Sequence, residues 1–174
     1  MNFEAVFIDR DSTMGGNGHF IHPKDFSLYP FSEEALHMLK KKNIKMFACT
    51  NQHRISKGQA SIQDFNEEFQ MLGFDDAFIC PHSPSDDCDC HKPKAGMLLD
   101  AAQKYNLDLT KTVFIGDVGA TDMLAAHAVG ATKVLVLTGW GKSSLEEYRY
   151  LWKGIQPDYI ADNLLEAVKW VLNR

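Results

Sequence analysis

The amino-acid sequence predicts an α/β protein with a Rossmann-like, doubly wound parallel sheet. Short runs of apolar residues alternate along the chain with longer amphipathic segments, and the links between them are short. Most of these runs are apolar throughout, as strands that are buried on both faces of a sheet must be. Such an alternation is typical of parallel strands joined by right-handed crossovers.

Six apolar runs are predicted to be strands, and six amphipathic segments are predicted to be helices. The predicted strands are Ala5–Ile8, Lys45–Cys49, Ala77–Cys80, Val113–Ile115, Val134–Leu137 and Tyr159–Ile160. The predicted helices are Glu33–Lys42, Ile62–Leu72, Ala95–Tyr105, Asp122–Val129, Ser144–Leu151 and Leu164–Leu172. Ser32 and Ser61 stand where the first two helices begin, and serine is a favoured N-cap residue. Asp64, three residues after Ser61, can complete a capping box.

Residues 1–174 are predicted to form a single domain, because no internal repeat, linker or low-complexity tract divides the chain. A chain of this length can bury a sizeable core without the help of disulfides. The hydrophobic fraction of 45% is ordinary for a globular protein. In a reducing compartment, the four cysteines are expected to be metal ligands or core residues.

Charge and terminal sequence limit the classes of function. The formal net charge is −5 and the longest basic run is Lys40–Lys42, which argues against binding to nucleic acid. The chain begins without the basic and apolar pattern of a signal peptide, and it has no stretch of about 18 apolar residues. We therefore expect a cytoplasmic protein that binds no membrane. We also expect a monomer, although the sequence leaves the oligomeric state open.

Polar residues follow three of the predicted strands, at the point where each strand ends. Asp9 and Thr50 come directly after an apolar run, and Asp117 follows the run Val113–Ile115 after one glycine. Because parallel sheets bind ligands outside the carboxyl ends of their strands, these three side chains are expected to gather at one edge. The sequence therefore predicts a polar site at this edge of the sheet.

Asp9 and Asp11 are candidates for covalent catalysis of phosphoryl transfer. In an extended segment, side chains two residues apart point the same way. One carboxylate can attack phosphorus to form an aspartyl-phosphate, while the other donates a proton to the leaving oxygen and later activates water. Neighbouring acids also tend to have their pKa values pushed apart, which suits these two roles. The alternative interpretation is a solvated turn.

Three further residues have the chemistry of a phosphate-binding site. Thr50 and Asn51 offer a hydroxyl and backbone N–H groups to phosphate oxygens, although they can equally begin a turn. Lys92 can neutralise phosphate and the charge that develops during transfer. It can also be a surface lysine that happens to precede a proline.

Further acids predict a magnesium site at the same edge. Asp117 would join Asp9 as an oxygen ligand, and Mg²⁺ is usually held by few carboxylates with water and substrate phosphate. Asp122 is a candidate for the same site. It can equally be the N-cap of the helix that follows.

A second cluster of metal-ligating residues lies in one short loop. Cys80, His82, Cys88 and Cys90 form a C-x-H…C-x-C pattern, and three thiolates with one imidazole are a common closed, structural Zn²⁺ site. His91 is an alternative to His82, but its adjacency to Cys90 makes the geometry poorer. The other interpretation is chance clustering. A metal-pinned loop would hold the nearby lysine over the phosphate without a large additional domain.

Taken together, these motifs strongly resemble the haloacid dehalogenase (HAD) superfamily of phosphohydrolases, subfamily IIIA. The sequence is similar to the branch that contains heptose-bisphosphate phosphatase and the histidinol-phosphate phosphatase domain. The motifs that carry the resemblance are Asp9-Arg10-Asp11-x-Thr13, Thr50-Asn51-Gln52, the cysteine loop from Cys80 to Cys90, Lys92-Pro93 with Gly96-Met97, and Gly116-Asp117. The resemblance implies the HAD fold without a large cap domain.

The resemblance also implies roles for the candidate residues. Asp9 would be the nucleophile and Asp11 the general acid and base, and Mg²⁺ would be held by Asp9, the Asp11 carbonyl and Asp117. Phosphate would contact Thr50, Asn51 and Lys92. The Zn²⁺ ligands would be Cys80, His82, Cys88 and Cys90.

Four positions depart from the pattern of the branch. His91 stands where arginine usually precedes the lysine, and histidine does not reproduce the bidentate grip of arginine. Ser12 replaces the usual glycine, and Val118 replaces a residue that is often basic. Asp122 lies one residue further along than in similar sequences.

The resemblance favours a Mg²⁺-dependent phosphatase that acts on a small phosphorylated metabolite. A sugar phosphate such as D-glycero-D-manno-heptose 1,7-bisphosphate is the first expectation, and histidinol phosphate is the alternative. A nucleic-acid 3′-phosphatase is a third hypothesis, which the acidic charge disfavours. A non-catalytic phosphate- or zinc-binding module is the fourth, and the presence of both Asp9 and Asp11 argues against it.

Overall fold

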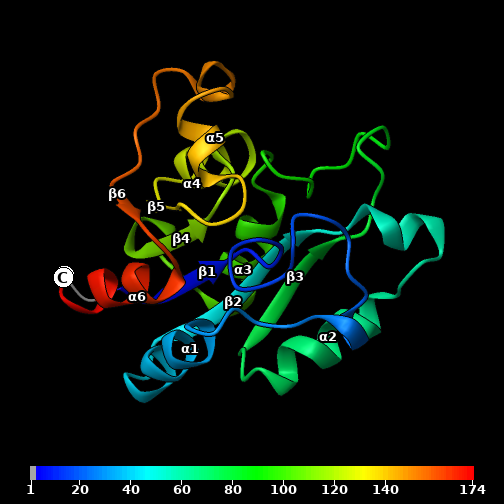
Figure 1. Cartoon of the computed structure of the whole chain (residues 1–174), viewed down its shortest axis with the longest axis horizontal. Helices are drawn as coiled ribbons and strands as arrows, with labels where there is room; N and C mark the ends of the chain where they lie inside the picture. The colour runs from blue at the N-terminus through cyan, green and yellow to red at the C-terminus, as the bar shows by residue number, and fades with distance from the viewer. Residues whose placement is uncertain (1–2) are drawn as a thin grey trace.

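The computed structural model describes residues 3–174, whose centre is a six-stranded sheet in which every strand pair is parallel. The strands are β1 (Ala5–Ile8), β2 (Lys45–Asn51), β3 (Asp76–Cys80), β4 (Thr112–Gly116), β5 (Thr132–Val136) and β6 (Tyr159–Ala161). They lie in the order β3-β2-β1-β4-β5-β6 (Figure 1). This order reverses direction at β1, so the predicted doubly wound parallel sheet is confirmed.

The position of β1 in the middle of the sheet explains why it carries the site. Its residues pair with β2 on one side and with β4 on the other, so that Ile8 lies beside both Ala48 and Ile115. Asp9 therefore leaves the sheet between the ends of β2 and β4. In open α/β sheets, the crevice at this reversal of strand order is where ligands bind.

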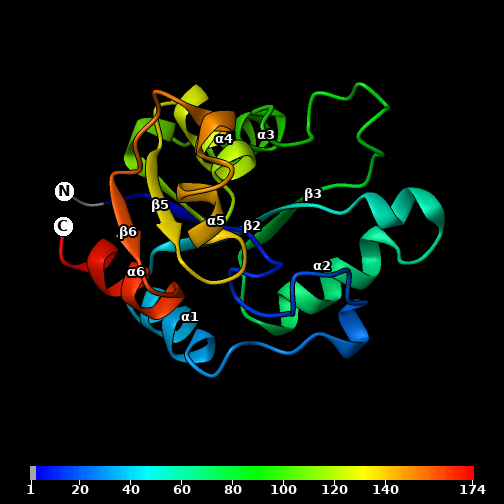
Figure 2. The ribbon, with the colours of Figure 1, turned by 45° about the horizontal axis from the view of Figure 1, so that its top comes forward.

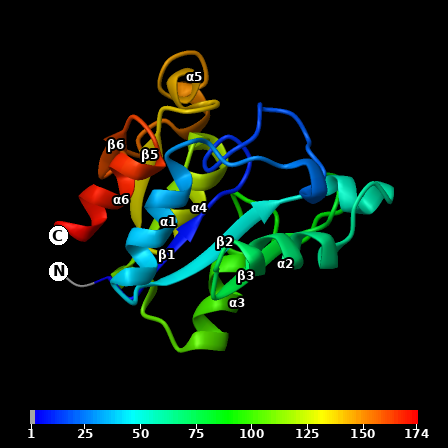
Figure 3. The same ribbon diagram turned by 60° about the horizontal axis from the view of Figure 1, so that its bottom comes forward.

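Helices cover both faces of the sheet. They are α1 (Ser32–Lys41), α2 (Ile62–Met71), α3 (Gly96–Tyr105), α4 (Leu124–Ala128), α5 (Gly141–Leu145) and α6 (Leu164–Leu172). One core, which contains Val6 and Ile8, receives the buried side chains of α1, α2 and α6, and α1 lies beside α6 (Figure 3). The other core contains Phe7 and receives those of α3 and α4. The alternation along β1 follows from strand geometry, which points successive side chains to opposite faces.

Of the two serines that were predicted to be N-caps, one caps its helix and the other does not. Ser61 caps α2 and forms the predicted capping box with Asp64, because each side chain accepts from the backbone N–H of the other residue. Ser32 instead lies inside α1 and makes no capping hydrogen bond. The helix begins one residue earlier than predicted because Phe31 already has helical dihedral angles.

The segment after β4 also differs from the prediction of a helix over Asp122–Val129. A π-helical turn spans Gly119–Met123, and α4 begins only at Leu124. The N-cap position of α4 is Met123, so the interpretation of Asp122 as a helix N-cap is wrong.

The predicted helix Ser144–Leu151 is wrong as well. The chain forms α5, which ends at Leu145, and then a short 3-10 helix at Arg149–Trp152. Ser144 bonds elsewhere, since its hydroxyl donates to the carbonyl of Asp117 and its own carbonyl accepts from the Trp152 indole. These contacts tie Ser144 to the end of β4. The Ser144 carbonyl is bonded to the indole and therefore does not accept the hydrogen bond that would continue the helix.

Two long segments leave the carboxyl edge of the sheet. Residues 9–31 form a loop with one short 3-10 helix at Pro23–Asp25, and residues 81–95 extend from the end of β3 toward α3 (Figure 2). Within residues 3–174, no helix is long and apolar enough to cross a lipid bilayer.

Candidate active site

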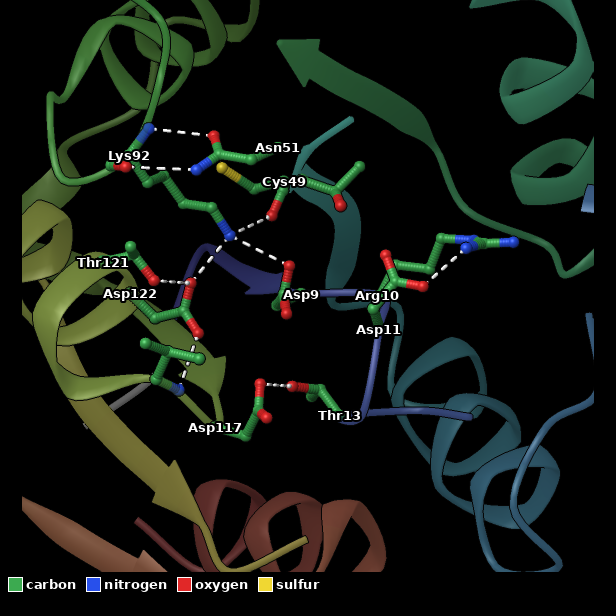
Figure 4. Close-up of polar contacts among 12 residues, drawn as sticks. Asp9, Arg10, Asp11, Thr13, Cys49, Asn51, Lys92, Asp117, Thr121 and Asp122 are labelled. Carbon is green, nitrogen blue, oxygen red and sulfur yellow. Dashed lines mark hydrogen bonds and ion pairs between the residues drawn. The ribbon is translucent and has the colours of Figure 1, made fainter. Parts of the chain in front are cut away.

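Three buried carboxylates meet at the carboxyl edge of the sheet. Asp9 follows β1, Asp117 follows β4 and Asp122 comes from the π-helical turn (Figure 4). Each offers an oxygen, and these oxygens all lie within 4.8 Å of one another. The expected gathering of Asp9 and Asp117 at one edge is confirmed.

Asp122 reaches the other two carboxylates because the backbone gives it room. A Cβ atom on Gly116 would overlap the Asp122 carboxylate, so the glycine at the end of β4 is needed for this packing. The Val118 N–H donates to Asp122 Oδ2 at 3.1 Å, which fixes the turn around the side chain.

Lys92 is the cation that lies among these acids (Figure 4). Its Nζ donates to Asp9 Oδ1 at 2.9 Å, to Asp122 Oδ1 at 2.7 Å and to the Cys49 carbonyl at 2.9 Å. Burial by itself would lower the pKa of Lys92, but the Asp122 and Asp9 carboxylates raise it above its ordinary value. The ammonium is therefore charged, and its three N–H donors all have acceptors.

Asn51 holds the backbone that carries Lys92. Its Oδ1 accepts from the Lys92 N–H at 2.9 Å and its Nδ2 donates to the Lys92 carbonyl at 3.1 Å. The neighbouring Thr50 is buried, and its hydroxyl accepts from Gln52 Nε2 at 3.0 Å. In this structure, the two predicted phosphate contacts thus bind protein groups, and Asn51 also lines the cavity described below.

The side chain of Asp11 is held by two donors. Arg10 Nη1 donates to Asp11 Oδ1 at 2.7 Å, and Gln52 Nε2 donates to Oδ2 at 2.6 Å. Burial raises the pKa of Asp11 and the Asp9 charge adds to this, while Arg10 opposes it; the net direction is upward. A carboxyl with a raised pKa can serve as a proton donor near neutral pH.

Arg10 is a fully buried residue for which the sequence indicated no role. Its Nε and Nη2 donate to the Glu68 carboxylate at 2.7 and 2.9 Å, and its guanidinium carbon lies 3.8 Å from the ring centroid of Phe26. The ring of Phe65 is also close, with its centroid at 4.9 Å. This arrangement links α2 and the loop after β1 to Asp11. Glu68, 58 residues from Arg10, gave no local signal of the contact.

Asp117 is oriented by two donors from distant parts of the chain. The Thr13 hydroxyl donates to its Oδ1 at 3.2 Å and the Trp140 N–H donates to its Oδ2 at 2.9 Å. Burial raises the pKa of Asp117 well above its usual value, and the charges of Asp9 and Asp122 raise it further. Burial likewise raises the pKa of Asp122 to about 6.

The chemistry of these carboxylates fits a divalent cation. Ionised acids that are buried together are unfavourable unless a positive charge compensates them. Lys92 supplies one such charge, and it contacts Asp9 and Asp122 but not Asp117. A hard cation held by oxygen ligands would supply the rest.

A cavity of about 190 Å³ lies directly above the carboxylates. Its lining comes from all the elements that meet at this edge. The lining residues are Asp9, Asp11, Ser12, Gly18, Asn51, Lys92, Asp117, Val118, Thr121, Asp122 and Trp140.

The predicted zinc quartet also comes together. Cys80 Sγ lies 3.6 Å from Cys88 Sγ and 3.1 Å from Cys90 Sγ, and His82 Nδ1 lies 3.1 Å from Cys90 Sγ. In a tetrahedral site with Zn–S bonds of about 2.3 Å, neighbouring sulfurs are about 3.8 Å apart, so the quartet fits the ion after a small expansion. His91 Nδ1 is also near, at 3.7 Å from Cys80 Sγ, but it lies outside the quartet whose atoms are mutually close.

Comparisons of the sequence with known proteins agree with this geometry. A sequence model of the HAD-hydrolase-like family matches residues 89–167. The D-glycero-β-D-manno-heptose-1,7-bisphosphate 7-phosphatase of Haemophilus ducreyi is 31% identical over 98% of this chain and 100% of its own length. The protein of the same name from Vibrio cholerae is 35% identical over 78% of this chain and 82% of its own.

Solved structures give the same result. The D,D-heptose 1,7-bisphosphate phosphatase of B. bronchiseptica, crystallised in complex with magnesium and phosphate, superposes with a TM-score of 0.83 at 25% identity over 98% of each chain. The phosphatase of that name from Burkholderia thailandensis has a TM-score of 0.71 at 22% identity over 98% of this chain and 99% of its own, which shows the fold alone. The match to the Haemophilus ducreyi protein over its whole length decides the family. The chain therefore belongs to the haloacid dehalogenase (HAD)-like hydrolase family, among its phosphatases.

Proposed function

We propose that the protein is a Mg²⁺-dependent phosphomonoesterase that hydrolyses a phosphorylated sugar through an aspartyl-phosphate on Asp9. The observation that carries the proposal is the pairing of Asp9 with Lys92 at a carboxylate cluster on the reversal point of the sheet. Asp11 lines the same cavity but is held by a different set of contacts. The two acids therefore have separate environments, as a nucleophile and a general acid require.

The reaction has two displacements at phosphorus. In the first, an Asp9 carboxylate oxygen bonds to phosphorus, the ester bond breaks and Asp11 gives its proton to the departing sugar oxygen. In the second, water attacks the same phosphorus and Asp11 takes the proton from that water. The bond between Asp9 and phosphorus then breaks, so that orthophosphate leaves and both carboxyl groups return to their starting state.

A magnesium ion would be held by Asp9, Asp117 and the main-chain carbonyl of Asp11. When bound, it would neutralise phosphate oxygens and orient them for in-line attack. The N–H of Trp140 and the hydroxyl of Thr13 keep the Asp117 carboxylate turned toward this position. Asp122 acts differently in the proposal, because its contacts to Lys92 and Val118 make it a positioning residue.

Lys92 is proposed to neutralise the phosphoryl group, with Thr50 and Asn51 as further contacts to phosphate oxygens. The ammonium is already placed beside Asp9 and costs no reorganisation when charge develops. Asn51 fixes the backbone of Lys92, so that movement of the loop is not needed to bring the charge into the site.

The quartet of Cys80, His82, Cys88 and Cys90 is proposed to hold a structural Zn²⁺. Residues 81–95 otherwise contain few side chains that could anchor the loop in a core, since most of them are exposed or half-buried. A closed metal site would fix this loop, and Lys92 follows Cys90 by two residues.

The substrate is proposed to be a phosphorylated sugar of the type of D-glycero-D-manno-heptose 1,7-bisphosphate. The names of the two curated relatives support this class. We further propose that the chain works as one domain without a cap, because a small phosphorylated metabolite can enter the cavity from solvent. A cytoplasmic location and a monomeric state remain predictions.

The test is Mg²⁺-dependent release of phosphate from a substrate panel. The panel contains the heptose bisphosphate, other sugar phosphates, histidinol phosphate, nucleotides and a 3′-phosphorylated oligonucleotide. We expect the highest kcat/KM on a sugar phosphate and no turnover by Asp9→Asn. Preference for histidinol phosphate or the oligonucleotide would refute the proposed substrate class, and phosphate release at the same rate by Asp9→Asn would refute the covalent mechanism.

A further inference from the structure

Trp140 is the one aromatic residue among the residues that line the catalytic cavity. Trp140 is 48% exposed, whereas Trp152 is only 1% exposed and packs in the core. Tryptophan is enriched at interfaces, where part of the ring is covered by apolar groups and part meets water. The exposure of Trp140 is thus unlike that of a packing residue.

The backbone on either side holds Trp140 at a fixed place beside the reacting groups. Its N–H donates to Asp117 Oδ2 at 2.9 Å. The preceding Gly139 has a φ of 55° and lies so close to Ser12 that a Cβ atom would overlap that side chain. On the far side, the Tyr148 ring meets the Trp140 ring edge to face, with centroids 6.5 Å apart. The indole is therefore positioned before any substrate arrives.

The cavity lining has more acidic side chains than basic ones. Among the lining residues, all of which lie within the described part of the chain, Lys92 is the only one with a lysine or arginine side chain. Its side chain is 3% exposed, and its ammonium donates to three acceptors on the floor of the site. A second phosphate on the substrate, far from the reacting one, would thus find no lysine or arginine in the lining to pair with.

We propose that Trp140 is a specificity-determining residue that packs against the apolar face of the sugar, and that the far end of the substrate is recognised by this contact rather than by charge. The inference rests on the proposed function, because it assumes that a sugar phosphate is hydrolysed at Asp9. Sugar rings present C–H groups on one face, and an indole can cover them while their hydroxyl groups stay in water. A second phosphate then adds little to binding.

The experiment compares three substrates in the wild-type protein and in Trp140→Ala and Trp140→Phe. The substrates are heptose 1,7-bisphosphate, the matching heptose 7-phosphate and acetyl phosphate, which has almost no organic part to pack. We expect the wild type to favour the bisphosphate over the monophosphate by less than about tenfold in kcat/KM. We expect Trp140→Ala to lower the ratio of heptose 7-phosphate to acetyl phosphate activity by about tenfold, mainly through KM, with most of the ratio kept in Trp140→Phe.

Two outcomes would overturn the inference. One is a wild-type preference for the bisphosphate of about tenfold or more, which would show that the second phosphate is recognised. The other is an unchanged activity ratio in Trp140→Ala, which would show that the indole does not contact the sugar. A failure of the proposed function looks different, because the wild type would then release no more phosphate than Asp9→Asn from any of the three substrates.

Discussion

The catalytic edge and the cysteine loop are both clusters of metal-ligating side chains, but they are assembled in different ways. Asp9, Lys92, Asp117 and Asp122 are buried and come from three separate segments, since Asp117 and Asp122 both lie in the stretch that follows β4. The cysteine loop, residues Cys80–Cys90, takes its ligand set from one short stretch, and most of it is exposed or half-buried. The fold holds the first cluster together, whereas the second is proposed to be held by a bound ion. Asn51 connects the two regions through the backbone of Lys92.

The largest expected effect is on activity at the catalytic edge. Asp9→Asn should lower kcat by at least about 10⁴-fold, because removal of a covalent nucleophile disables both displacements. The circular dichroism spectrum and zinc content should match those of the wild type, since asparagine has the same shape. A variant that keeps more than a small fraction of the wild-type rate would contradict the assignment of Asp9.

The next largest effect concerns the buried ion pair of Arg10 and Glu68, which lies beside the catalytic edge. Glu68→Gln should lower the free energy of unfolding by about 3 kcal/mol, because it leaves Asp11 as the one carboxylate that pairs with the buried Arg10 guanidinium. Urea unfolding followed by circular dichroism measures this change. Glu67→Gln is the matched control, since Glu67 is the exposed neighbour on the same helix. Equal effects of the two substitutions would mean that the pair contributes nothing specific.

Breaking the cysteine loop should affect activity less than breaking the catalytic edge. Cys88→Ser should abolish tight zinc binding and lower kcat/KM by about tenfold, since the loop that carries Lys92 loses its anchor. Zinc is measured by metal analysis, which should find about one ion per chain in the wild type.

Cys49→Ala is the control for this loop, because Cys49 is the cysteine that lies outside the quartet. It should keep its zinc. If the wild-type protein binds no zinc and all four of its thiols are free, the proposed metal site is refuted. The cysteine loop would then not be a second metal site to compare with the catalytic edge.

The smallest expected effect concerns the pH dependence of stability. The folded protein raises the pKa of Asp122 from its usual 3.8 to about 6, so the ionised form of this carboxyl is disfavoured by folding. The resulting destabilisation is absent below the unfolded pKa, grows as the pH rises between the two values and is complete above the folded pKa. Magnesium bound beside the acids should relieve it.

We therefore expect Mg²⁺ to raise the Tm by about 5 °C more at about pH 7.5 than at about pH 5. Thermal unfolding with zinc retained and with or without Mg²⁺ gives the two differences. Asp122→Asn should reduce the dependence on pH. A Tm gain from Mg²⁺ that is the same at both pH values would contradict a cation site at these carboxylates.

Much of the fold could be predicted because its signals are local. A buried parallel strand such as Ala5–Ile8 must be apolar on both faces, so its position and its carboxyl end are evident in the chain. The capping box at Ser61 is equally local. In the wrong helix prediction that began at Ser144, the hydroxyl bonds to Asp117 and the carbonyl to the Trp152 indole, and neither contact belongs to the predicted helix.

The candidate site shows the same division. Asp9, Asp11, Asp117 and the cysteine pattern were found from strand ends and ligand spacing, both of which are properties of short segments. The clamp of Arg10 and Glu68 on Asp11, and the π-helical turn that brings in Asp122, could not be found in this way. The contacts of Arg10 with Glu68 and of Asp122 with Lys92 join residues that are neighbours only after the sheet and helices have packed.

The sequence by itself thus determined the parallel sheet, the candidate carboxylates at its edge and the pattern of metal-ligating residues in the cysteine loop. The tertiary structure decided how those groups are charged and held, because burial and proximity set their pKa values and their hydrogen-bond partners. It also decided that Trp140, rather than a lysine or arginine, stands beside Asp117 in the cavity lining. Hydrophobic periodicity is a property of the sequence itself. The electrostatic field and the shape of a site arise only after distant segments have packed together and excluded water.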